Sequence, residues 1–161
     1  MNPSNPLQLR TPSDKEIYWT REFHAPNKLV FDSMTKPDLI RRWLLGPEGW
    51  SMPVCKVDLR VRGRYRYVWS HPERGEMGVG GVFKEINAPT KLVNTERFDQ
   101  SWYPGEAIGT VILEEKNGKT ILHSTMLYES KTARDTVLES KIELGLSLGY
   151  SRLVAVLAEL T

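Results

Sequence analysis

Apolar and polar residues alternate along six consecutive runs in the middle of the chain, which is the pattern of half-buried β-strands. Asn117-Gly118 separates two of these runs and is the strongest hairpin signal, because both residues tolerate the positive φ of a tight turn. An earlier run with the same alternation contains Ile17, Trp19 and Phe23. We therefore expect an antiparallel sheet of about seven strands, the last six at 54–61, 64–71, 78–86, 91–98, 107–115 and 120–128.

Proline and a helical period mark the remaining elements. Pro26 and Pro37 each stand where a first helical turn would begin, which predicts two short helices, over 26–34 and 37–44. After Tyr128 the apolar residues recur at steps of three and four and form one stripe. This stripe predicts a short helix over 132–139 and a long C-terminal helix from about Ile142.

These elements predict an α+β fold in which a curved antiparallel sheet buries one face under the long C-terminal helix. A twisted sheet of this size need not fill the volume beneath a single helix, so an internal cavity is expected. Residues 1–13 contain three prolines and follow neither period. They predict a flexible N-terminal tail, followed by a single domain over 14–161.

Composition narrows the classes of function. The 22 Lys and Arg residues nearly balance the 20 Asp and Glu residues, which leaves a net charge of +2, too small for general nucleic-acid binding. Cys55 is the single cysteine, and the chain opens without the basic and apolar segments of a secretion signal. We therefore expect a cytoplasmic protein. No apolar run is long enough to span a membrane.

Three stretches resemble a known superfamily: "TREFHAPNKLVFDSMTKPDLIRRWLLGPEGW" (20–50), "KVDLRVRGRYRYVW" (56–69) and "ARDTVLESKIELGLSLGYSRLVAVLAEL" (133–160). Through these stretches the chain resembles the SRPBCC, or START-like, superfamily. Within it, the chain is most similar to the branch related to the C-terminal domain of the activator of the heat-shock chaperone ATPase. The resemblance implies the helix-grip fold, with an apolar cavity between sheet and C-terminal helix. Arg62 departs from the family pattern, which usually has a second glycine before Gly63.

The predicted strand at 64–71 places three aromatic side chains and His71 on one face. Aromatic side chains with polar tips suit a small-molecule pocket, although plain core packing would use them too. Apolar residues of the long helix would form the floor of this pocket, with Trp43 at its mouth. The predicted ligand-binding residues are Trp43, Tyr65, Tyr67, Trp69, His71, Phe83, Arg97, Met126, Tyr128, Leu138, Ile142, Leu146 and Tyr150.

Gly145 and Gly149 lie one turn apart in the long helix, where each costs about 1 kcal/mol relative to alanine. We expect either close packing of the helix on the sheet or space left for a ligand. The same segment, "GLSLG", matches the nucleophile elbow of α/β-hydrolases. That motif requires a strand before the serine, whereas Ser147 lies in the helical stripe, so we predict no nucleophile there.

Other candidate chemistry is weak. The three histidines show no metal-ligand spacing, and the glycines at 78–81 are not followed by the lysine of a phosphate-binding loop. We predict no catalytic residue, metal or cofactor. One open alternative is that folding brings His71 near Glu96, Arg97 or Tyr128 as an acid or base.

The leading hypothesis is therefore a binding protein for a small apolar or aromatic molecule. The second is a co-chaperone-like interaction module that uses an outer surface, such as the one carrying Arg64 and Arg66, to meet a chaperone. It ranks second because eukaryotic activators have another domain before this one, for which 161 residues leave no room. A cyclase or hydratase is the third, by analogy of fold alone. We expect a monomer or homodimer, with no nucleic-acid or membrane partner.

Overall fold

The computed structural model describes residues 7–161. The elements follow one another in the order β1 (Gln8–Arg10), β2 (Glu16–Phe23), α1 (Asn27–Thr35), α2 (Pro37–Trp43), β3 (Ser51–Val57), β4 (Arg64–His71), β5 (Gly75–Asn87), β6 (Lys91–Phe98), β7 (Ala107–Lys116), β8 (Lys119–Leu127), α3 (Lys131–Glu139) and α4 (Ile142–Leu160). Within this range, no helix combines the length and the apolar character needed to cross a membrane.

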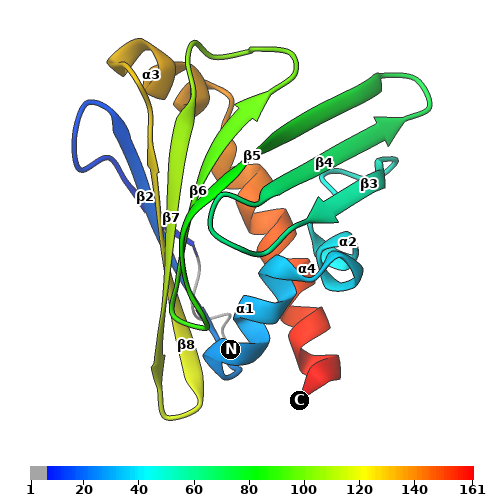
Figure 1. The fold of residues 1–161 in the computed structure, drawn as a ribbon, viewed down its shortest axis with the longest axis vertical. Coiled ribbons are helices and arrows are strands. Elements are labelled where there is room, and N and C mark those ends of the chain that lie inside the picture. The colour runs from blue at the N-terminus through cyan, green and yellow to red at the C-terminus, as the bar shows by residue number, and fades with distance from the viewer. Residues whose placement is uncertain (1–6) are drawn as a thin grey trace.

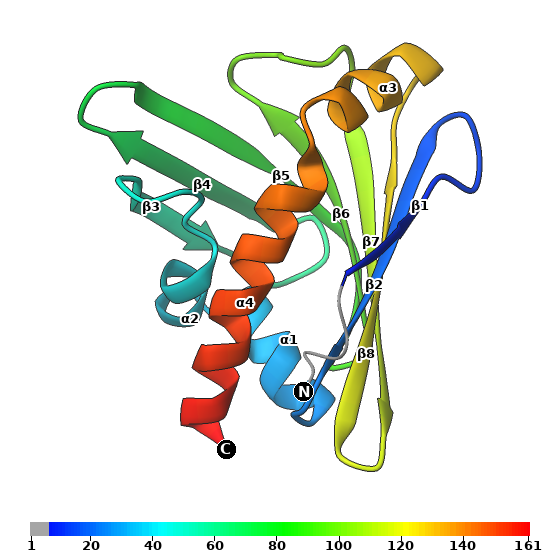
Figure 2. The ribbon, with the colours of Figure 1, turned by 180° about the vertical axis from the view of Figure 1, so that it is seen from behind.

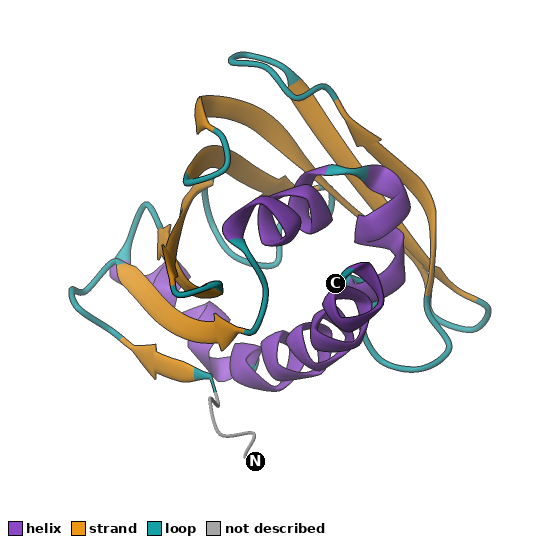
Figure 3. Cartoon of the chain, turned by 90° about the horizontal axis from the view of Figure 1, so that it is seen from below, coloured by secondary structure: helices purple, strands orange, loops and turns teal. Residues whose placement is uncertain are grey.

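All eight strands form one antiparallel sheet in the order β1-β2-β8-β7-β6-β5-β4-β3. The sheet curves around α4, which crosses its concave side (Figure 1, Figure 2). Seen from below, the strands form an arc around the helices (Figure 3). This arrangement confirms the predicted α+β helix-grip fold. The hairpin between β7 and β8 is also confirmed, with Asn117 and Gly118 at φ values of 55° and 78°.

Residues 8–10 correct the prediction of a flexible tail over 1–13. They form β1, which pairs with β2 so that Leu9 lies opposite Trp19, and the sheet has eight strands rather than about seven. Leu9 also packs against the core. Three residues are too few to show an alternating pattern, so only the pairing with β2 reveals this edge strand. Residues 1–6 lie outside the described residues.

The strand that was predicted over 54–61 ends earlier in the structure, because the chain turns between β3 and β4. β3 stops at Val57, and a Cβ atom on Gly63 would overlap the backbone oxygen of Asp58. Arg62, where the related family usually has glycine, adopts a left-handed conformation with φ of 71°. The backbone therefore keeps a conformation that glycine would adopt at lower cost.

The predicted helices are confirmed to within a few residues at their ends. α1 begins after Pro26, and Pro37 is the first residue of α2. α3 and α4 are separate helices because Lys141, at φ of 59°, interrupts the helical backbone between them.

The two halves of α4 have different surroundings. In the C-terminal half Tyr150, Leu153 and Leu157 are buried, and this helix contacts both α1 and α2. In the N-terminal half, Ile142 and Leu146 are only half-buried. The short helices thus close one end of the curved sheet, and a cavity remains beneath the first turns of α4.

Candidate functional site

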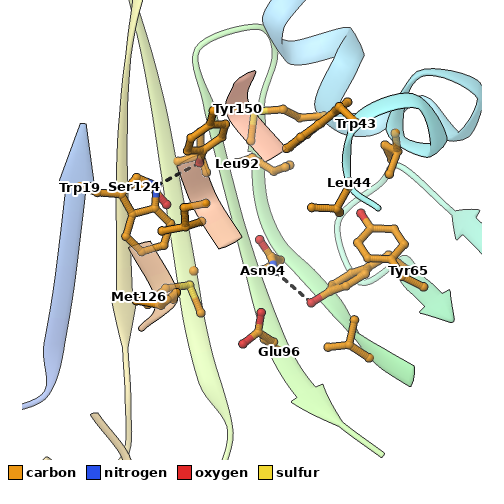
Figure 4. A pocket seen from close by; sticks show the side chains of 18 of the residues that line it. Trp19, Trp43, Leu44, Tyr65, Leu92, Asn94, Glu96, Ser124, Met126 and Tyr150 are labelled. Carbon is orange, nitrogen blue, oxygen red and sulfur yellow. Dashed lines mark hydrogen bonds between the residues drawn. The ribbon is translucent and has the colours of Figure 1, made fainter. Parts of the chain in front are cut away.

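The cavity has a volume of about 280 Å³ and lies between the concave face of the sheet, α2 and the N-terminal half of α4 (Figure 4). Most of the side chains around it are aromatic or aliphatic. They are Trp19, Met34, Ile40, Trp43, Leu44, Tyr65, Tyr67, Trp69, Val79, Phe83, Leu92, Asn94, Glu96, Phe98, Gly109, Val111, Ser124, Met126, Tyr128, Ile142, Leu146 and Tyr150.

The strand register explains why the cavity has space next to the sheet. Asn94 on β6 lies opposite Gly109 on β7, which in turn lies opposite Met126 on β8. In the neighbouring row, Glu96 lies opposite Ala107. Because the middle strand contributes only a glycine and an alanine to these rows, space remains between the longer side chains on either side.

Three aromatic residues of β4 form one wall, as their parity predicts. The ring centroids of Tyr65 and Tyr67 are 5.1 Å apart, and those of Tyr67 and Trp69 are 6.0 Å apart. The Trp69 indole N–H donates to the backbone oxygen of Leu44 at 2.7 Å, and the Tyr65 hydroxyl donates to that of Thr95. The protein thus satisfies the polar tips of Trp69 and Tyr65 itself.

Two tryptophans from other elements are satisfied in the same way. The Trp19 indole N–H donates to the Tyr150 hydroxyl at 2.9 Å, and that of Trp43 donates to the backbone oxygen of Ser33 at 2.8 Å. Burial raises the pKa of Tyr150 to about 12, and the hydrogen bond from Trp19 partly opposes this rise. The phenol is therefore neutral at physiological pH, and the wall carries no charge here.

Glu96 is the exception in this apolar lining. Among the described residues that line the cavity, Glu96 is the only one with a carboxyl side chain, and none is Lys, Arg or His. The Tyr103 hydroxyl donates to its Oε2 atom at 2.9 Å. Burial raises the pKa of the Glu96 carboxyl, and the hydrogen bond from Tyr103 offsets part of this rise.

Asn94 lies beside Glu96 on the same face of β6 and points into the same space (Figure 4). Its Nδ2 atom donates to the Tyr65 hydroxyl and to the backbone oxygen of Thr95, both at 3.1 Å. These two bonds orient the amide and leave its Oδ1 atom without a hydrogen bond among the described residues.

Most of the predicted ligand-binding residues line the cavity. These are Trp43, Tyr65, Tyr67, Trp69, Phe83, Met126, Tyr128, Ile142, Leu146 and Tyr150. The lining shows where these side chains lie, and ligand binding by them stays a prediction.

Three predicted residues lie elsewhere. His71 shares the parity of the aromatic wall but sits at the end of β4, where its ring is 5.2 Å from that of Trp50 and its Nδ1 accepts from the backbone of Glu73. Arg97 alternates with Glu96 and is exposed, so it belongs to the opposite face of β6. Leu138 packs against the core from α3.

Several lining residues were not predicted: Trp19, Met34, Ile40, Leu44, Val79, Leu92, Asn94, Glu96, Phe98, Gly109, Val111 and Ser124. For the lining residues of β6, the sequence contains a pattern that could have indicated the inner face. Leu92 and Phe98 share one parity, and Asn94 and Glu96 lie between them on the same face. The signal was weak because two polar residues stand on the face that proves to be the inner one.

The two helix glycines have different surroundings. A Cβ atom on Gly149 would lie 3.7 Å from the Trp43 ring, which is ordinary contact, so the close neighbour is α2 rather than the sheet. A Cβ atom on Gly145 would meet nothing within 4 Å, and Gly145 does not line the cavity. For Gly145, both expectations, close packing and ligand space, are wrong.

Ser147 lies inside α4, as predicted from its position in the helical stripe. A helical serine lacks the strained strand-to-helix turn that exposes a nucleophile. In residues 7–161, no group of three or more His, Cys, Asp or Glu side chains could hold a metal ion.

Comparisons with known proteins agree with the resemblance. The family model described as "Activator of Hsp90 ATPase homolog 1-like protein" matches residues 24–158. A solved structure from Rhodobacter sphaeroides superposes with a TM-score of 0.91 at 28% identity, covering 96% of this chain and 99% of that chain. No curated protein matches.

A further structure, the AHSA1-like protein from Aeromonas hydrophila, superposes with a TM-score of 0.67 at 20% identity, covering 86% of this chain and 93% of that chain. At that identity the likeness concerns the fold alone. The family model, in contrast, spans most of the chain. The protein therefore belongs to the activator of Hsp90 ATPase homolog 1-like family, within the SRPBCC superfamily.

Proposed function

We propose that this protein binds a small apolar or aromatic molecule in the cavity between the sheet and α4. The observation that carries the proposal is a space of about 280 Å³ surrounded by aromatic and aliphatic side chains. Ligand sites in proteins are typically of this kind, with an apolar lining and a few polar groups that orient the ligand.

The hydrogen bonds of the wall support the proposal. Trp19, Trp43 and Trp69 each give their indole N–H to a protein acceptor, so their ring faces are available for apolar contact. An apolar ligand would gain free energy by covering this surface, and it would leave no indole N–H unpaired.

The alternative is a surface that binds a chaperone, to which the family's description points. Of the two arginines considered for that surface, Arg66 already donates to both carboxylate oxygens of Asp99, at 2.9 and 2.6 Å. Arg64 is exposed and is left as the free candidate. If this alternative holds, the protein should raise the ATP turnover of a chaperone ATPase, and Arg64→Glu should reduce the effect.

A thermal-shift screen with two tryptophan variants tests the cavity. Apolar aromatic compounds should raise the melting temperature of the wild type, with about 2.7 kcal/mol of stabilisation at a hundredfold excess over Kd. Leu146→Trp, which fills the cavity, should abolish the shift. Leu144→Trp is the control, because Leu144 lies on the same helix but is 66% exposed, and it should keep the shift.

The opposite pair of results would overturn the proposal. If the interior is a filled core, no compound shifts the wild type, and Leu146→Trp loses roughly 1–3 kcal/mol of stability through overpacking. A cytoplasmic location, a single domain over 14–161 and a monomeric or homodimeric state stay predictions. So does the cyclase or hydratase alternative, for which product formation from a bound compound would be the evidence.

A further inference from the structure

Two neighbouring polar residues that face the cavity, Glu96 and Asn94, each present a hydrogen-bond acceptor to it. Glu96 uses one carboxylate oxygen to accept from Tyr103, and among the described residues its Oε1 atom has no hydrogen-bonding partner. The Oδ1 atom of the neighbouring Asn94 is free in the same sense, because both hydrogen bonds of the Asn94 side chain are made by its Nδ2 atom. A ligand that pairs with these two atoms must therefore bring hydrogen-bond donors.

The same end is rich in aromatic rings. Tyr103, which bonds Glu96, contacts Tyr128 edge-to-face with the ring centroids 5.3 Å apart, and its centroid lies 6.1 Å from that of Phe98. Phe98, Tyr128 and Tyr65 also line the cavity. Aromatic faces carry partial negative charge and attract organic cations, and desolvation strengthens this attraction.

The charge balance points to the same kind of ligand. A carboxylate held away from water without a cation is costly, and the described lining contains no Lys, Arg or His to compensate Glu96. A ligand with its own carboxylate would place two negative charges in one apolar space, which increases that cost. A ligand with a protonated amine would remove it.

We propose that the natural ligand is an amphiphilic amine: an apolar or aromatic body with a protonated amino group, which binds Glu96 Oε1 and Asn94 Oδ1 while the body contacts the aromatic wall. This inference rests on the proposed function, since it assigns the ligand class of the same cavity. It goes beyond that function by assigning Glu96 as the residue that determines specificity.

The test uses matched ligands that share one body, such as phenyl or naphthyl, and differ in one head group: aminomethyl, hydroxymethyl, ethyl or carboxylate. Affinities are measured by titration calorimetry for the wild type, Glu96→Gln and Glu106→Gln. Glu96→Gln removes the charge but keeps an acceptor for Tyr103. Glu106→Gln removes a nearby carboxyl that is 40% exposed and lies 4.0 Å from Arg97.

We expect the amine to bind the wild type about tenfold or more tightly than its ethyl and hydroxymethyl analogues, as for a charge-assisted hydrogen bond. Glu96→Gln should erase this preference while still binding the ethyl analogue, which also shows that the variant is folded. Glu106→Gln should retain the preference.

Two failures are distinguishable. If the ethyl or hydroxymethyl analogue binds as tightly as the amine, or if Glu96→Gln keeps the preference, the amine assignment is overturned and the apolar cavity remains a binding site. If no member of any series binds the wild type, the proposed function itself fails, and this inference fails with it.

Discussion

Glu96 places a carboxyl group where its charged form is costly. Burial raises its pKa above the ordinary value of 4.5, with the hydrogen bond from Tyr103 acting in the opposite direction. The folded protein therefore holds this proton more tightly than the unfolded chain does. The resulting stabilisation is fully present below the ordinary pKa and is lost as the pH rises through the raised one. Tyr65, Tyr103 and Tyr128 face Glu96, and burial raises the pKa of each, so all three stay neutral.

Glu96→Gln should remove this dependence on pH. We expect the variant to be more stable than the wild type above the raised pKa, and the difference to shrink as the pH falls toward the ordinary value, because glutamine carries no charge. Urea denaturation across this pH range measures the effect. Glu106→Gln is the control, with an expected change of no more than about 0.5 kcal/mol. Parallel stability curves for the wild type and Glu96→Gln would contradict the prediction.

Ser147 offers a second check at the residue scale. Because it lies within α4, its hydroxyl lacks the strained turn that exposes a nucleophile. A serine-reactive phosphonate should leave the protein unlabelled, as judged by intact mass. Stoichiometric labelling at Ser147 would show that the helical position does not prevent nucleophilic chemistry.

At the scale of elements, a glycine in α4 and a glycine in β5 differ in whether the structure has room for a side chain. Gly145 of α4 has open space where a side chain would begin, so the helix bears the cost of glycine without a packing gain. On Gly81 of β5, by contrast, a Cβ atom would overlap the backbone oxygen of Thr95 on β6. Glycine is therefore needed where these two paired strands approach closely, and it is dispensable in the helix.

We expect Gly145→Ala to stabilise the protein by roughly 0.5–1 kcal/mol. Gly81→Ala should destabilise it by about 1–3 kcal/mol, the usual cost of forcing extra atoms into a packed site. Urea unfolding of both variants measures the two changes. A loss of stability in Gly145→Ala would mean that the first turns of α4 require the glycine for another reason.

At the scale of the whole molecule, the two halves of α4 differ in how many of their side chains are buried against other elements. The C-terminal half contacts α2 through the stacked rings of Trp43 and Tyr150 and the ion pair between Arg42 and Glu159, and its inner residues are buried. The N-terminal half follows the interruption at Lys141 and contributes half-buried Ile142 and Leu146 to the cavity lining. The N-terminal half of α4 is therefore the less stable half of the helix.

Hydrogen exchange should show this difference. We expect the amides of residues 142–148 to exchange faster than those of residues 150–157, because fewer buried contacts oppose their opening. A ligand in the cavity should slow exchange in the first segment more than in the second. Equal protection in the two halves would contradict this account of α4.

Much of the architecture could be predicted from local pattern. Alternation and turn residues predict the strands from β3 to β8, and the helical stripe predicts α3 and α4. Parity also predicted that Tyr65, Tyr67 and Trp69 share one face of β4, and in the structure that face lines the cavity. These features could be predicted because each depends on residues that are near one another along the chain.

The pairing of distant strands decided the rest. β1 is a strand only because it meets β2, and His71 and Leu138 shared the expected periods yet lie outside the cavity. Glu96 and Asn94 face inward because β6 pairs with β7 and curves with the sheet, which alternation cannot reveal when the inner face is partly polar. Local spacing therefore determined which residues share a face, and only the tertiary contacts decided which face encloses the cavity.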